Sequence, residues 1–76
     1  MDRESIFDER RREIGWTNTS DNGRIIHYFT YKHGQVGEFD TKTRQYHRWK
    51  TRPGQVVNPF AGTDYGISDV LYWAEH

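Results

Sequence analysis

A tight turn at Ser20-Asp21-Asn22-Gly23 constrains the fold more than any other feature of this sequence. Asn-Gly supplies the positive φ angles that a short hairpin connection requires. The turn joins Trp16–Ser20 to Arg24–Tyr31, RIIHYFTY, whose β-branched and aromatic residues are typical of a strand. Two more turns and two more strand-like runs follow, and the sequence therefore predicts a four-stranded antiparallel β-meander. The two turns are His33-Gly34 and Thr41–Thr43, and the two strand-like runs are Gln35–Asp40 and Arg44–Thr51.

Charge order and apolar spacing predict a helix at each end of the chain. Residues 2–14 hold acidic side chains mainly in their first half and Arg10–Arg12 later, the order that the helix dipole favours. Near the other end, four apolar residues recur at helical spacing in a segment that runs to Glu75. They are Ile67, Val70, Leu71 and Ala74. We therefore expect an α+β fold in one small domain, residues 1–76, with a single layer of helix on sheet.

Aromatic rings have to do much of the packing in the core of such a domain. The chain has 12 aromatic residues, 16% of its 76, whereas only 33% of its residues are hydrophobic. Each buried ring removes on the order of 150–250 Å² from water, so a few rings hold a small domain together. The remaining segment, residues 52–66, is rich in Pro and Gly and is expected to be a loop, with Val56-Val57 as a candidate edge strand.

Formal charge is zero but unevenly distributed. Residues 24–52 hold seven basic and two acidic side chains, whereas residues 53–76 hold three acidic side chains and no basic one. The absence of cysteine excludes disulfides and thiolate metal sites. No apolar run approaches the ~18 residues of a membrane span, and the first residues are too charged for a signal peptide. We expect a cytoplasmic protein.

The segment Lys42–Arg52, KTRQYHRWKTR, contains five basic residues, three aromatic or histidine rings and no acid. With the two-residue period of a strand, alternate side chains share one face. A three-residue turn at Thr41–Thr43 would pair Phe39 with Gln45 and place the basic side chains of this strand beside Phe29 and Tyr31, on the face away from the helices. His47 and Trp49 would then lie under the helices.

This register predicts one aromatic and cationic binding surface. It comprises Phe29, Tyr31, Arg44, Tyr46, Arg48, Lys50 and Arg52. Tyr and Arg are residue types that dominate protein-binding hot spots, so we expect a non-catalytic binding module. The expected partner is a protein or nucleoprotein complex, on which the chain acts as an inhibitor or adaptor, for example a phage-type inhibitor of a host machine.

Two alternatives use the same residues. Rings between cations also suit RNA or single-stranded DNA, whose bases stack while its phosphates pair with Arg and Lys. In that case Arg48→Glu would abolish binding and leave the fold intact. A third alternative is a metal-independent endoribonuclease, with Glu38 as base, His47 as acid and arginines for the phosphate. The expected register places Glu38 and His47 on opposite faces of the sheet, and this separation disfavours the endoribonuclease alternative.

The histidines predict no metal site, because His27, His33, His47 and His76 lack the spacings of metal-binding motifs. We expect no cofactor and no membrane association.

Overall fold

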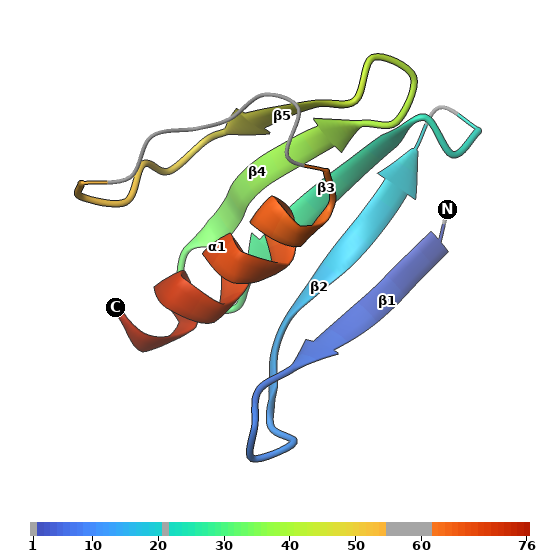
Figure 1. The fold of residues 1–76 in the computed structure, drawn as a ribbon. Helices are drawn as coiled ribbons and strands as arrows, with labels where there is room; N and C mark the ends of the chain where they lie inside the picture. The colour runs from blue at the N-terminus through green and yellow to red at the C-terminus, as the bar shows by residue number, and fades with distance from the viewer. Residues whose placement is uncertain (1, 21, 55–61) are drawn as a thin grey trace.

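The structure, a computed structural model, describes residues 2–20, 22–54 and 62–76, and contains one antiparallel sheet and one helix, α1. Neighbouring strands in the sheet are also neighbours in sequence, in the order β1-β2-β3-β4-β5. The elements are β1 (Asp2–Phe7), β2 (Glu13–Ser20), β3 (Ile25–Thr30), β4 (Gly34–Asp40), β5 (Gln45–Arg48) and α1 (Asp64–Glu75). Figure 1 shows α1 lying across one face of this sheet. The antiparallel sheet and the C-terminal helix are as expected, whereas the prediction of four strands was wrong.

The predicted N-terminal helix is instead a hairpin of β1 and β2. The Asp8 carboxylate organises its turn: Oδ1 accepts the backbone N–H groups of Arg10 and Arg12, each at 2.9 Å. Arg12 also contacts Oδ2 through its guanidinium at 2.9 Å. A sheet-edge strand accommodates alternating charges, and among residues 3–7 of β1 only Ile6 is buried, at 7% exposure. The charge order that fits a helix dipole therefore belongs to an exposed hairpin.

The helix packs over β2, β3 and β4, where the core lies. Six hydrophobic side chains are buried there: Ile6, Tyr28, Val36, Phe39, Tyr46 and Val70. The predicted helix segment is confirmed, but its predicted apolar face is confirmed only in part, because Val70 is buried whereas Ile67 and Leu71 are not. Gly66, Asp69 and Val70 face the sheet, whereas Ile67 and Leu71 remain 38% and 40% exposed.

The β4–β5 pairing differs from the predicted register by one residue. Phe39 pairs with Tyr46, not with Gln45, because the turn contains four residues, Thr41–Arg44. Arg44 adopts a left-handed conformation, with φ of 59°. A one-residue slip exchanges the two faces of a strand, so Tyr46 and Arg48 point toward α1 and His47 points away from it.

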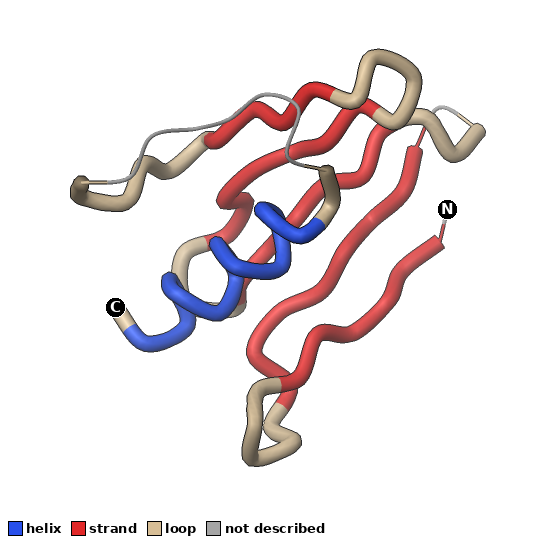
Figure 2. The backbone as a smooth tube through the Cα atoms, in the orientation of Figure 1, coloured by secondary structure: helices blue, strands red, loops and turns tan. Residues whose placement is uncertain are grey.

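The sheet therefore has a helix face and an open face, and on the open face no described element covers the strands (Figure 2). The candidate edge strand Val56-Val57 lies outside the described residues. No helix in the described ranges has the length and apolar character needed to cross a membrane.

Candidate functional site

The structure does not bring the seven predicted binding residues together. Phe29 lies on the open face, beside Tyr31, which directly follows β3. Arg44 is exposed in the β4–β5 turn. The other four, which are Tyr46, Arg48, Lys50 and Arg52, contact α1. The predicted continuous surface of aromatic and cationic side chains was therefore wrong.

Asp69, on the side of α1 that faces the sheet, contacts three of these four side chains. Its Oδ2 accepts the Tyr46 hydroxyl at 2.7 Å and the Arg48 Nε–H at 2.9 Å. Arg52 Nε lies 3.0 Å from Oδ1, near enough for an ion pair but outside hydrogen-bond alignment. The side chains of Asp69 and Arg48 are 0% and 1% exposed. Burial, followed by the Asp69 hydrogen bond, raises the pKa of Tyr46.

Two of the five other basic side chains in residues 24–52, Lys50 and Arg24, are also engaged. Lys50 Nζ lies 4.6 Å from the Trp73 ring centre, and Trp73 Nε1 donates to the Lys50 carbonyl at 3.2 Å. Arg24 pairs with Asp40 at 3.1 Å. The Arg24 hydrogen bond holds the pKa of Asp40 below its usual value. Three of the seven basic side chains in residues 24–52, those of Arg24, Arg48 and Arg52, are thus paired with carboxylates of the same molecule.

The open face carries a cluster of rings that spans β1, β2 and the end of β3. Trp16 and Phe29 are cross-strand partners, and their rings stack with centres 5.1 Å apart and planes 4° apart. Tyr31 approaches Trp16 at 4.7 Å between ring centres. The Arg3 guanidinium lies 4.6 Å from the Trp16 ring centre. We name Arg3, Trp16, Phe29 and Tyr31 the open-face cluster.

Tyr31 is the most exposed member among the three rings, at 57%. Its hydroxyl donates to the Glu13 carboxylate, and this hydrogen bond raises the pKa of Tyr31. The Arg3 guanidinium donates to the same hydroxyl at 3.4 Å. Phe7, which pairs with Glu13 at the end of β1, is also exposed, at 56%. Sequence reasoning missed Arg3 and Trp16 because it expected their segments to be a helix and a short strand.

The open face also carries a group of polar side chains around His27. Its Nε2 lies 3.0 Å from the Ser20 hydroxyl, and its Nδ1 lies 3.1 Å from the Gln35 amide nitrogen and 3.6 Å from Glu38. This order resembles a serine–histidine–carboxylate relay. However, with the Gln35 amide donating to Nδ1, the neutral imidazole carries its proton on Nε2 and donates it to Ser20. A general base needs the opposite tautomer.

The ribonuclease residues are also rearranged. Glu38 and His47 are direct cross-strand partners on the open face, so the expectation that they lie on opposite faces was wrong. In the ribonuclease alternative, arginines would stabilise the phosphate. Arg48 is instead buried on the helix face, and Arg44 lies in the β4–β5 turn. Among the described residues, no group of three His, Asp or Glu side chains could hold a metal ion.

No family model, curated protein or solved structure matches this chain. Its function must therefore be argued from these side chains.

Proposed function

We propose that the protein is a non-catalytic binding module that docks on a protein partner through the open-face cluster. The observation that carries this proposal is a group of three aromatic side chains with an arginine on a sheet face that no described element covers. Large rings and arginine supply most of the energy at protein interfaces because they exclude water over a wide area. A small rigid sheet presents them with little loss of conformational freedom, which suits an inhibitor or adaptor.

The ring geometry favours a protein over nucleic acid as the partner. A base stacks on the free face of a ring. Trp16 has Phe29 stacked on one side at 5.1 Å, while Arg3 lies over its ring at 4.6 Å. The cluster thus offers ring edges and one exposed tyrosine, rather than a row of free faces. Arg48 and Arg52, which would have followed the phosphates, are paired with Asp69.

Affinity capture with matched variants tests the proposal. Tyr31→Glu adds a charge to the open face, and Thr43→Glu adds the same charge at an exposed side chain of the β4–β5 turn. Wild type and Thr43→Glu should capture the same protein from nuclease-treated extract of the source organism, and Tyr31→Glu should lose it. With that partner purified, Tyr31→Glu should weaken binding by at least about tenfold. Equal binding by all three forms would refute the open-face cluster as the interface.

Direct nucleic-acid binding is the outcome that would replace the proposal. It would show as binding of labelled RNA or single-stranded DNA that weakens steeply between roughly 50 and 200 mM salt. If Arg3→Glu abolished that binding and protein capture required intact nucleic acid, the open face would be a nucleic-acid surface instead.

A further inference from the structure

The helix face is only partly covered, and a groove remains along one side of α1. The helix packs mainly on β2, β3 and β4, and in Figure 1 β1 and the neighbouring length of β2 extend beyond it. Two hollows follow this side of the helix. One, of about 320 Å³, is lined by Ile67, Thr17, Ile26 and Glu4. The other, of about 560 Å³, lies along the C-terminal half of α1; Leu71 and Ile14 line it on this side, and it extends to Arg52 and Tyr72 on the other side of the helix.

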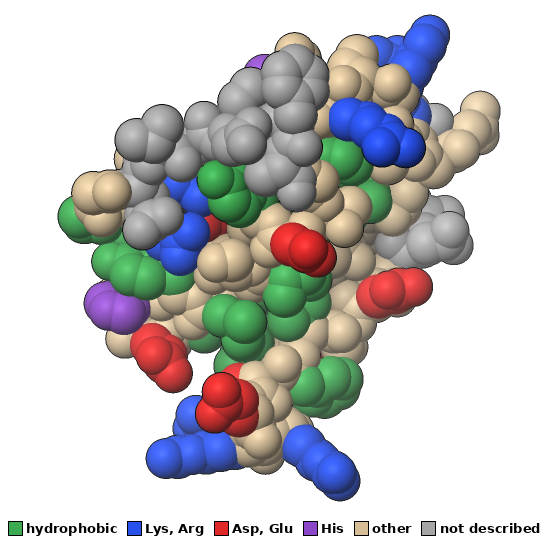
Figure 3. Space-filling view, viewed as in Figure 1, with side chains coloured by type: hydrophobic (Ala, Val, Ile, Leu, Met, Phe, Trp, Pro, Cys, Tyr) green, Lys and Arg blue, Asp and Glu red, His purple; other side chains and the backbone are tan. Residues whose placement is uncertain are grey.

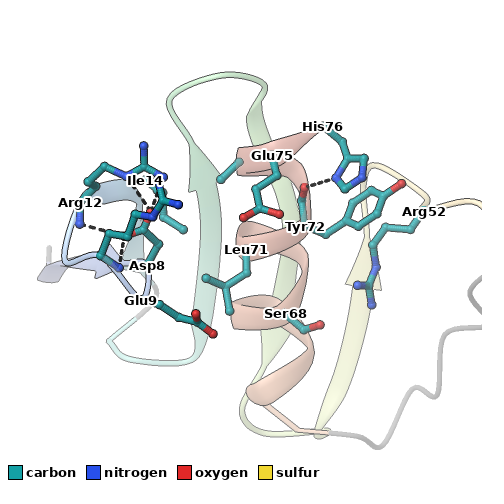
Figure 4. Close-up of a pocket in the computed structure, with 12 residues that line it drawn as sticks. Asp8, Glu9, Arg12, Ile14, Arg52, Ser68, Leu71, Tyr72, Glu75 and His76 are labelled. Carbon is teal, nitrogen blue, oxygen red and sulfur yellow. Dashed lines mark hydrogen bonds and ion pairs between the residues drawn. The ribbon is translucent and has the colours of Figure 1, made fainter.

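The groove has an apolar centre. Ile67 and Leu71 are four residues apart, so they lie one above the other on the same side of α1. Both are about two-fifths exposed, at 38% and 40%, although each borders one of the hollows. Ile14 and Ile26, on β2 and β3, are partly buried hydrophobic residues at the sheet side of the same groove. Figure 4 shows Leu71 and Glu75 on the side of α1 that faces the turn carrying Asp8 and Glu9.

The rim of the groove is acidic. Glu4, Glu9 and Glu75 line the hollows, and none of them forms an ion pair with another described residue. The cations at the rim are mostly engaged, since Arg12 pairs with Asp8 and Arg52 with Asp69. The last turn of α1 contains no basic residue, so Glu75 adds to the negative end of the helix dipole. In Figure 3, acidic side chains flank hydrophobic groups on this face.

We propose that this groove binds a basic amphipathic helix of a protein partner. An apolar stripe on such a helix would cover Ile67 and Leu71, and flanking Lys or Arg side chains would pair with the three free glutamates. The 12-residue α1 is about 18 Å long, which matches a partner helix of about three turns. Charge disfavours a second copy of this chain as the occupant, because symmetric pairing would bring the acidic rims together.

A labelled synthetic helix of Lys and Leu, amphipathic at helical spacing, tests the groove by fluorescence anisotropy. Leu71→Lys should weaken its binding by about tenfold or more, because it removes apolar contact and adds like charge. Replacing Glu4, Glu9 and Glu75 together by Gln should weaken binding severalfold and reduce its salt dependence. The control Thr43→Lys adds the same charge at an exposed side chain of the β4–β5 turn and should leave affinity unchanged.

Two results would overturn the groove proposal. One is equal binding of the peptide by wild type and Leu71→Lys. The other is equal binding of a peptide with the same composition but scrambled order, which would indicate nonspecific attraction. Either result leaves the proposed function untouched, because the open-face cluster contains neither Leu71 nor any of the three glutamates.

Discussion

At the residue scale, Asp69 connects the helix to the last strand and to the segment beyond it. A fully buried aspartate is unfavourable unless it is paired, and here two arginines and a tyrosine hydroxyl surround it. Arg48 depends on the same contact, since its side chain is 1% exposed. Arg48→Glu would therefore place two carboxylates together inside the molecule. The expectation that this substitution leaves the fold intact was drawn from a register that the structure does not have.

Asp69→Asn should lower the free energy of unfolding by about 3 kcal/mol or more, because it leaves the Arg48 charge buried without its counter-charge. Urea unfolding at neutral pH measures the change. The matched control is Glu75→Gln, which neutralises an exposed carboxylate in the same helix, where the helix dipole is unfavourable for it. This control should change stability by less than about 0.5 kcal/mol. Equal effects of the two substitutions would contradict the buried role of Asp69.

At the element scale, the length of one turn decides what β5 presents. The turn at Asn22-Gly23 could be predicted because its residues favour the φ angles of 56° and 92° that they adopt. At the β4–β5 turn the left-handed residue is Arg44, and nothing in an arginine side chain marks that conformation. The existence of β5 was therefore predictable from the composition of this segment. Which face of the sheet carries Tyr46 and Arg48 was not predictable.

The N-terminal hairpin was unpredictable for a different reason. Its sequence contains few apolar residues, so neither a helical nor a two-residue period is strong in it. The structure shows that one carboxylate, Asp8, satisfies the backbone of the turn, and that one side chain of β1, Ile6, reaches the core. The Asp8 contacts are local, whereas the contribution of Ile6 depends on its tertiary position. The open-face cluster was consequently found only in part, through Phe29 and Tyr31.

The approach of α1 to the sheet depends on Gly66. A Cβ atom at this position would lie 2.2 Å from Cζ of Tyr28, well inside van der Waals contact. Gly→Ala in a helix normally stabilises by up to about 1 kcal/mol. Here Gly66→Ala should instead destabilise by roughly 1–3 kcal/mol, because the helix or the ring must shift.

Thermal and urea unfolding measure this sign reversal. Ser68→Ala, in the same helix but outside the buried core, should be neutral or slightly stabilising and serves as the control. A Gly66→Ala protein more stable than wild type would show that the helix does not approach Tyr28 as closely as the structure has it.

At the scale of the whole molecule, the helix and the sheet are joined largely through tyrosines, and this predicts alkaline unfolding. Burial, followed by the charge of Asp64, raises the pKa of Tyr28 to about 12. The Tyr28 hydroxyl also donates to the Thr63 carbonyl at 3.2 Å, just before α1 begins. The pKa of Tyr46 is also raised, by burial and by the hydrogen bond to Asp69. Both rings thus favour the neutral form in the folded state.

The direction in which stability changes with pH follows from the number of protons that each state binds. Between the ordinary tyrosine pKa of about 10 and the raised values, the unfolded chain has released protons that the folded chain retains. Stability should therefore be complete below about pH 10 and should fall as the pH rises through about 12. Denaturant midpoints measured across this range, with tyrosinate absorbance, should show ionisation of the buried rings in the same step as unfolding. Tyr28→Phe should flatten the pH dependence, since one of the linked protons is gone; an unchanged slope would mean that Tyr28 ionises freely in the folded protein.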